Sequence, residues 1–125
     1  MILDAWGPDR AACFEEAVLA LVELFADTSA AHIIDRHAVT IAASAPEDQL
    51  LAVLDEVILT LDTNDAVPIS AEIACLEGGG VRAILALAET ESLTNTGPVP
   101  KAIARSELLV RTDGDGVSAR FLVDV

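Results

Sequence analysis

Few residues of this chain could carry out nucleophilic or acid–base chemistry, and their positions argue against it. The chain has two histidines, His32 and His37, both in or beside an expected loop, and no Gly-x-Ser-x-Gly nucleophile elbow. Cys13 and Cys75 lie far apart, each within an apolar run, so we expect two buried free thiols rather than a disulfide or a reactive cysteine. The sequence therefore predicts no catalytic residues and a protein that is not an enzyme.

Two glycine-containing segments resemble ligand-binding loops but predict turns. Residues 78–80, Gly-Gly-Gly, precede a strand-like run, whereas a phosphate-binding loop needs a following helix and a Lys-Ser or Lys-Thr pair. Residues 113–116, Asp-Gly-Asp-Gly, are followed by Arg120 and Leu122 where a calcium loop needs further acidic ligands. Each segment therefore predicts the turn of a β-hairpin.

The strand pair around residues 113–116 places one acidic residue where it could do chemistry. If the chain reverses at Gly114 and Asp115, counting outward puts Arg105 opposite Asp124 on the face turned away from the helices. Two interpretations of Asp124 then stay open. Either it forms a cross-strand ion pair with Arg105 worth roughly 0.2–1 kcal/mol, or it is a metal ligand that needs further carboxylates from a neighbouring strand.

The charge balance is strongly acidic, with 21 Asp and Glu residues, 7 Lys and Arg residues and a formal net charge of −14. The basic residues are too few and too scattered for direct nucleic-acid binding or for adhesion to an anionic membrane. The acidity favours solubility, cation binding or docking on a basic partner surface. No segment reaches the roughly 18 apolar residues of a membrane span, and Met1–Asp4 has no signal-peptide pattern. We therefore expect a cytoplasmic protein.

The apolar pattern predicts a single α+β domain over residues 1–125, with an aliphatic core because 53% of residues are hydrophobic and 3% aromatic. Amphipathic helices are expected over about Arg10–Ala26 and Pro46–Leu61. The strand-like runs are Ile2–Trp6, His37–Ala43, Val67–Leu76, Val81–Ala88, Ala102–Thr112 and Val117–Val125. These elements predict a two-layer sandwich with both helices on one face of a mixed, mostly antiparallel sheet of about six strands. The exposed first strand leaves a homodimer through a sheet edge open.

Two stretches of the chain resemble the archease family. Ala5-Trp6-Gly7, five further residues and then Cys13–Ala17 resemble the family's Ala-Trp-Gly … Ala-Phe-Glu-Glu-Ala opening, with the same spacing. Ala119–Val125 resembles its closing strand, which ends in Asp-Val or Asp-Ile. Between them, Pro100-Lys101 fits the family's Pro-Lys, and Glu91 stands at the distance of the Glu that leads the same loop. The order of elements also agrees over nearly the whole chain.

This resemblance implies a chaperone-like accessory protein. Archeases bind a divalent cation, calcium or manganese, through acidic residues and help the GTP-dependent RNA ligase of tRNA splicing complete its guanylylation and turn over. The family's terminal metal ligand maps onto Asp124. The family's Asp-His-Thr-Ala-Asp strand before Ala-Trp-Gly is not among these residues, and two of its histidines are replaced, near Pro98 and at 108–110. These departures imply an alternative, a degenerate member kept as a protein-interaction or small-ligand-binding module without RNA ligase activation.

Overall fold

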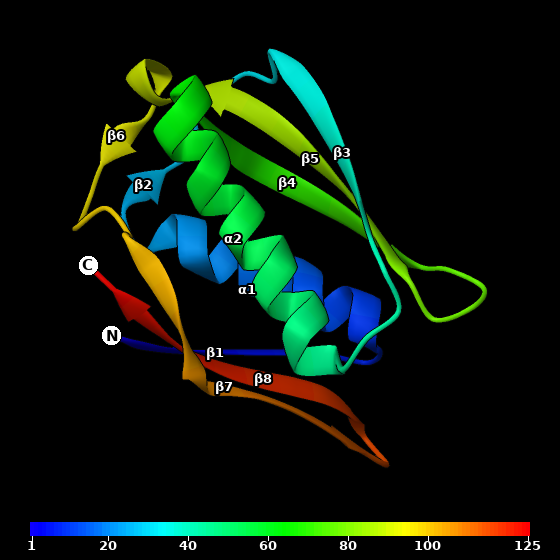
Figure 1. Cartoon of the computed structure of the whole chain (residues 1–125). Helices are drawn as coiled ribbons and strands as arrows, with labels where there is room; N and C mark the ends of the chain where they lie inside the picture. Colours follow the sequence, from blue (N-terminus) through cyan, green and yellow to red (C-terminus); the bar gives the residue numbers. More distant parts are fainter.

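Two helices lie between two three-stranded antiparallel sheets in the computed structural model, which describes all residues from Met1 to Val125 (Figure 1). The first sheet has the order β1-β8-β7 and consists of β1 (Ile2–Gly7), β8 (Gly116–Asp124) and β7 (Ala102–Asp113). The second has the order β3-β5-β4 and consists of β3 (Asp35–Ile41), β5 (Val81–Glu89) and β4 (Ala66–Cys75). The remaining elements are two paired two-residue strands and one 3-10 turn, β2 (Ala26–Asp27), β6 (Thr94–Asn95) and η1 (Thr90–Ser92).

The helix α1 (Arg10–Glu23) is central and packs against β1 on one side and β4 on the other. It begins after Pro8, where the Asp9 carboxylate accepts a hydrogen bond of 2.8 Å from the backbone N–H of Ala12 and caps the first turn. The helix ends three residues before the predicted Ala26. The chain is instead extended there, because Ala26–Asp27 pairs with β6.

The helix α2 (Pro46–Asn64) packs against both sheets and continues three residues beyond the predicted Leu61. It starts at a proline, with Glu47 and Asp48 in the first turn as expected for a helix N-terminus. It stops at Asp65, which takes a left-handed conformation with φ of 49°. No helix of the structure is both long and apolar enough to cross a bilayer.

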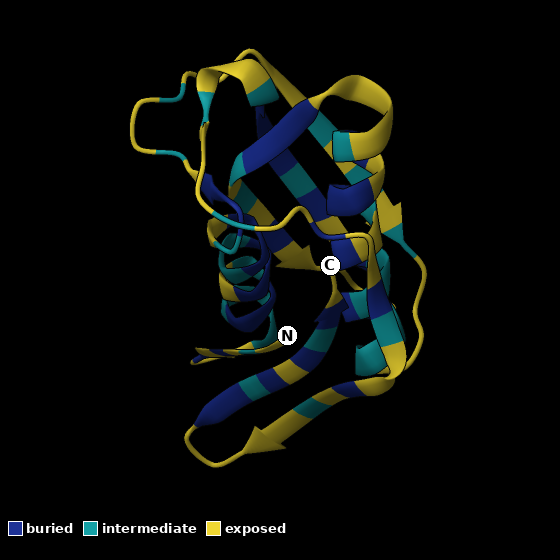
Figure 2. Ribbon diagram, turned by 90° about the vertical axis from the view of Figure 1, so that its left-hand side faces the viewer, coloured by how far each residue is buried: buried dark blue, intermediate teal, exposed yellow.

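The core is one cluster of 27 buried residues drawn from both helices and both large sheets. Its side chains are mainly Val, Leu and Ala, with Phe14 and Phe121 as the largest fully buried ones. Buried and exposed residues alternate along the strands, so each sheet turns one face to the helices and the other to solvent (Figure 2). The predicted aliphatic core and amphipathic helices are therefore confirmed.

The predicted α+β class, with helices packed on sheet, is confirmed, but the strands are divided differently. Eight strands form three sheets, and every pairing is antiparallel, whereas we expected one mixed sheet of about six strands. The two large sheets hydrogen-bond only within themselves, and the helices fill the space between them. Both predicted hairpins are present, and Gly78 and Gly79 have φ of 85° and 94°, which suits glycine.

The C-terminal hairpin keeps its predicted register near the turn and loses it farther away. Asp113 lies opposite Gly116 and Leu109 opposite Arg120, as expected. Beyond Leu109 the register shifts, so that residues 105–108 stand opposite Phe121 alone and Asp124 faces Ala102. The predicted Arg105–Asp124 pair is therefore wrong, because a β-bulge inserts extra residues into β7.

Candidate functional site

The residues of the predicted metal site and of the Pro-Lys motif meet at one corner of the molecule. The Lys101 N–H, just before β7, donates a hydrogen bond of 2.7 Å to the carbonyl oxygen of Asp124 at the end of β8. The Val123 N–H donates to the carbonyl oxygen of Met1 at 2.7 Å, so the start of the chain lies beside its end (Figure 1). Lys101 and Asp124 are both exposed. The fold thus brings Lys101 and Asp124 together on the surface, while Pro100 is buried.

This corner does not supply a complete set of cation ligands. No group of three or more His, Cys, Asp or Glu residues close enough to hold a metal ion exists in the structure. A calcium ion takes six to eight oxygen ligands, usually from several carboxylates. Glu91 lies exposed in η1, and no hydrogen bond joins it to Lys101 or Asp124. One carboxylate from Asp124 does not fit a divalent cation without further ligands.

His32 has the loop position that we predicted, whereas His37, expected beside the loop at the start of a strand, lies two residues inside β3. His32 is exposed in the loop before β3. His37 lies on β3, an edge strand, and its Nε2 is 2.6 Å from Oε1 of Glu56 on α2. This contact links β3 to α2. Neither histidine has a serine or cysteine nucleophile among its hydrogen-bond partners.

The two cysteines differ, and only one prediction holds. Cys13 is fully buried on α1, its thiol lies 3.8 Å from the carbonyl oxygen of Ala5, and burial raises the pKa of the thiol to about 11. Cys75, which we expected to be buried, is exposed. It is the last residue of β4, where the β4–β5 hairpin extends beyond the helices, so no element covers its side chain (Figure 1).

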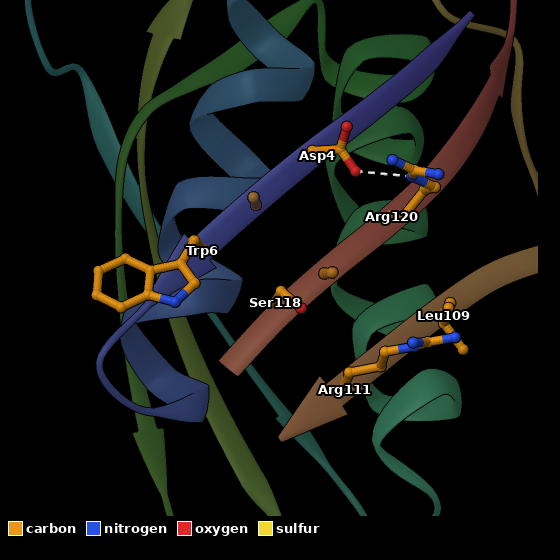
Figure 3. A pocket seen from close by; sticks show the side chains of 8 residues that line it. Asp4, Trp6, Leu109, Arg111, Ser118 and Arg120 are labelled. Carbon is orange, nitrogen blue, oxygen red and sulfur yellow. Dashed lines mark hydrogen bonds and ion pairs between the residues drawn. The ribbon is translucent and has the colours of Figure 1, made fainter. Parts of the chain in front are cut away.

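A second surface feature was not predicted, a hollow of about 500 Å³ on the outer face of the β1-β8-β7 sheet (Figure 3). It is lined by Asp4, Ala5, Trp6, Leu109, Arg111, Ser118, Ala119 and Arg120. The Arg120 Nε donates a hydrogen bond of 2.8 Å to Oδ1 of Asp4, and this bond raises the pKa of Arg120. Period-two alternation around Ala5 could have indicated that Trp6 points outward, but the neighbours of Trp6 on β8 and β7 follow only from the strand order and register.

With these features in place, the chain can be compared with known proteins. All residues from 1 to 125 match the model of the Archease protein family (MTH1598/TM1083). The chain belongs to the archease family. It is 34% identical over 123 residues to the "Probable protein archease" of Mycobacterium tuberculosis strain CDC 1551 / Oshkosh, an alignment that covers 98% of this chain and 68% of that protein. The values for the protein of strain ATCC 25618 / H37Rv are the same.

Solved structures of archease relatives share the fold. A Thermotoga maritima archease described as a possible chaperone superposes with a TM-score of 0.71 at 16% identity, covering 100% of this chain and 90% of the other. Methanobacterium thermoautotrophicum protein 1598 gives a TM-score of 0.74 at 20% identity, with coverages of 99% and 91%. At these identities the likeness shows the fold alone. The family match over residues 1–125 and the 34% identity to the Mycobacterium tuberculosis protein confirm the resemblance inferred from the Ala-Trp-Gly and closing-strand motifs.

Proposed function

We propose that this chain is an accessory protein of archease type that promotes guanylylation and turnover of the GTP-dependent RNA ligase of tRNA splicing and is not itself an enzyme. The observation that carries the proposal is the family match over the whole chain. The net charge of −14 supports it, because an acidic protein associates faster with a basic RNA-handling enzyme. The free thiols of Cys13 and Cys75 are compatible with a reducing cytoplasm.

Within this proposal, the corner formed by Lys101 and Asp124 is the part that acts on the partner. The backbone hydrogen bond of 2.7 Å fixes the two residues side by side, and both side chains are exposed. An exposed carboxylate and an exposed ammonium group at one corner can engage a polar site of mixed charge on another protein. No residue of this corner is needed for the buried core, so its side chains are free to contact the ligase.

The direct test is a guanylylation assay with the purified RNA ligase of the same organism. We expect the wild-type chain to accelerate guanylylation and Asp124→Asn to lower this acceleration at least about tenfold, since removing one partner of a charge pair at an interface can cost this much. Glu77→Gln is the matched control, because it removes one exposed carboxylate from the β4–β5 turn. Absence of acceleration by saturating wild-type protein would contradict the proposal.

A divalent cation at Asp124 is a separate proposal, since Asp124 belongs to no group of three or more His, Cys, Asp or Glu residues that could hold a metal ion. Titration calorimetry with calcium and with manganese should show heat for the wild-type chain that disappears in Asp124→Ala. If the wild-type chain and Asp124→Ala bind the cations equally weakly, the proposed cation site is wrong. The proposal that the chain acts on the RNA ligase is unaffected by that result.

The alternative is a degenerate family member that acts as an interaction or small-ligand module without ligase activation. The absence of a three-residue metal cluster favours it. In that case the chain could bind the ligase or another partner while the guanylylation rate stays unchanged, and the same assay separates the two functions.

A further inference from the structure

The outer face of the β1-β8-β7 sheet exposes large side chains that the fold does not need. Strand alternation turns residues 2, 4 and 6 of β1 outward, together with residues 118 and 120 of β8 and 109 and 111 of β7. Ile2, Trp6 and Leu109 are 61%, 55% and 42% exposed. Large apolar side chains gathered on one face are typical of a protein-interaction surface.

The hollow on this face follows from the register of the three strands. Trp6 lies opposite Ser118, and Ser118 lies opposite Arg111, so a small side chain stands between an indole and a guanidinium (Figure 3). The Asp4–Arg120 ion pair occupies the next row. No ion pair or hydrogen bond engages the Arg111 side chain within the chain.

A neighbouring glycine leaves room for the Trp6 ring close to the backbone. A Cβ atom at Gly116 would lie 2.9 Å from Cζ2 of the indole and 2.5 Å from the carbonyl oxygen of Gly7. The absence of a side chain at Gly116 therefore lets the ring rest close to the backbone. A preorganised aromatic side chain loses little conformational entropy when it binds. Trp and Arg are also the residues that most often dominate interface energies.

The adjacent edge of the sheet is open as well. The Met1–Val123 hydrogen bond and the alternation of antiparallel ladders direct the backbone N–H and C=O groups of Ile2, Asp4 and Trp6 away from β8. On two of the other three edge strands of the large sheets, a carboxylate from a helix accepts a hydrogen bond from a backbone N–H at the open edge. The Ile73 N–H of β4 donates to Glu15 and the Val110 N–H of β7 donates to Glu47, both at 2.9 Å. β1 has no such hydrogen bond.

We propose that this face, centred on Trp6, is the docking surface for the protein partner, that the indole enters an apolar pocket on that partner, and that basic residues of the partner meet the acidic ends of the face. The inference rests on the proposed function and names the surface that function uses. Asp113 and Asp115 lie at one end of the face and Asp124 at the other, in a chain of net charge −14, so a basic partner is the complementary one. A second copy would bring two strongly acidic proteins together, and a nucleic acid would find only Arg111 and Arg120.

The experiment uses the fact that Trp6 is the only tryptophan. Biosynthetic labelling with 5-fluorotryptophan gives one ¹⁹F resonance, which reports on this face in the otherwise wild-type protein. We expect unlabelled RNA ligase of the same organism to shift or broaden that resonance. Trp6→Ala and Arg111→Ala should each weaken binding at least about tenfold, as hot-spot residues do. Leu59→Ala, which removes a 52% exposed apolar side chain from α2, should bind like the wild type.

The outcomes separate the surface from the function. If the ligase binds and is stimulated while the ¹⁹F resonance stays unchanged and Trp6→Ala binds normally, the docking surface is wrong and the proposed function stands. If the wild-type chain neither binds nor stimulates the ligase, both fall. A resonance that changes with the concentration of the labelled protein alone identifies a self-interface and overturns the inference, as does a change caused by RNA alone.

Discussion

The two large sheets bury the same core but present different surfaces to solvent. On the outer face of the β3-β5-β4 sheet, alternation places small, polar or charged side chains such as Ala38, Thr40 and Arg82, and the one large apolar residue of its central strand, Ile84, is only partly exposed. The outer face of the β1-β8-β7 sheet carries Trp6 and Leu109 instead. The inner faces are constrained alike by packing against α1 and α2. Core packing therefore does not explain why only one outer face carries large exposed apolar side chains. This difference favours an interaction role for the face around Trp6.

The largest expected effect tests whether the inner faces are equivalent. Phe121 of β8 and Leu85 of β5 are both fully buried, so Phe121→Ala should lower the free energy of unfolding by about 3–5 kcal/mol and Leu85→Ala by about 2–5 kcal/mol. Leu109→Ala, on the outer face, should cost less than about 1 kcal/mol. Urea denaturation measures all three. If either core variant lowers the free energy of unfolding by less than about 1 kcal/mol, the inner faces of the two sheets do not contribute alike to stability.

A smaller effect compares the turns of the two hairpins. Gly116 has φ of 153° and no room for a Cβ, so Gly116→Ala should destabilise the protein by more than about 1 kcal/mol. Gly78 has φ of 85° but open space around it, and Gly78→Ala should cost only about 1 kcal/mol, from backbone strain. Gly114→Ala is the control, since it has neither constraint. Thermal melts should rank the variants in this order, and equal melting temperatures for all three would contradict it.

The smallest effect concerns the two thiols. Cys75 should react with Ellman's reagent in the folded protein at pH 8, whereas Cys13 should react only after unfolding, because it is buried and its pKa is about 11. The raised pKa of Cys13 makes the free energy of unfolding decrease at high pH. The protonated thiol stabilises the fold below its ordinary pKa of 9.0, and this contribution is lost as the pH rises through about 11. Two equally fast thiols in the folded state would show that α1 is not packed as described.

Local sequence signals predicted the helices and the hairpins well, because caps, glycine turns and apolar spacing act over a few residues. The position of Asp124 could not be predicted in the same way. The bulge in β7 accompanies contacts with a distant element, the Glu47–Val110 hydrogen bond and the Arg105–Asp48 ion pair of 2.6 Å. Counting along a hairpin cannot reveal a helix that engages one of its strands. The division into separate sheets and the exposure of Cys75 depend likewise on how far α1 and α2 extend over the strands.

The candidate site was predicted in part. The closing-strand motif singled out Asp124, and the Pro-Lys motif singled out Lys101, but only the fold shows that the two residues are neighbours. The hollow beside Trp6 needs the register of three strands whose ends lie far apart in the sequence. Strand alternation could indicate that Trp6 faces solvent. It could not indicate that Arg111 and Ser118 stand beside it.

The bulge at residues 105–108 also divides the C-terminal hairpin into two independent lengths of ladder. In an uninterrupted ladder, inserting or deleting one residue would invert every side chain beyond it. Here the register of the pairs near the turn and the register of the pairs that place Asp124 opposite Ala102 are independent. The residues between them have no ladder partner and absorb the difference. The corner at Asp124 and the face around Trp6 therefore do not depend on one continuous strand register.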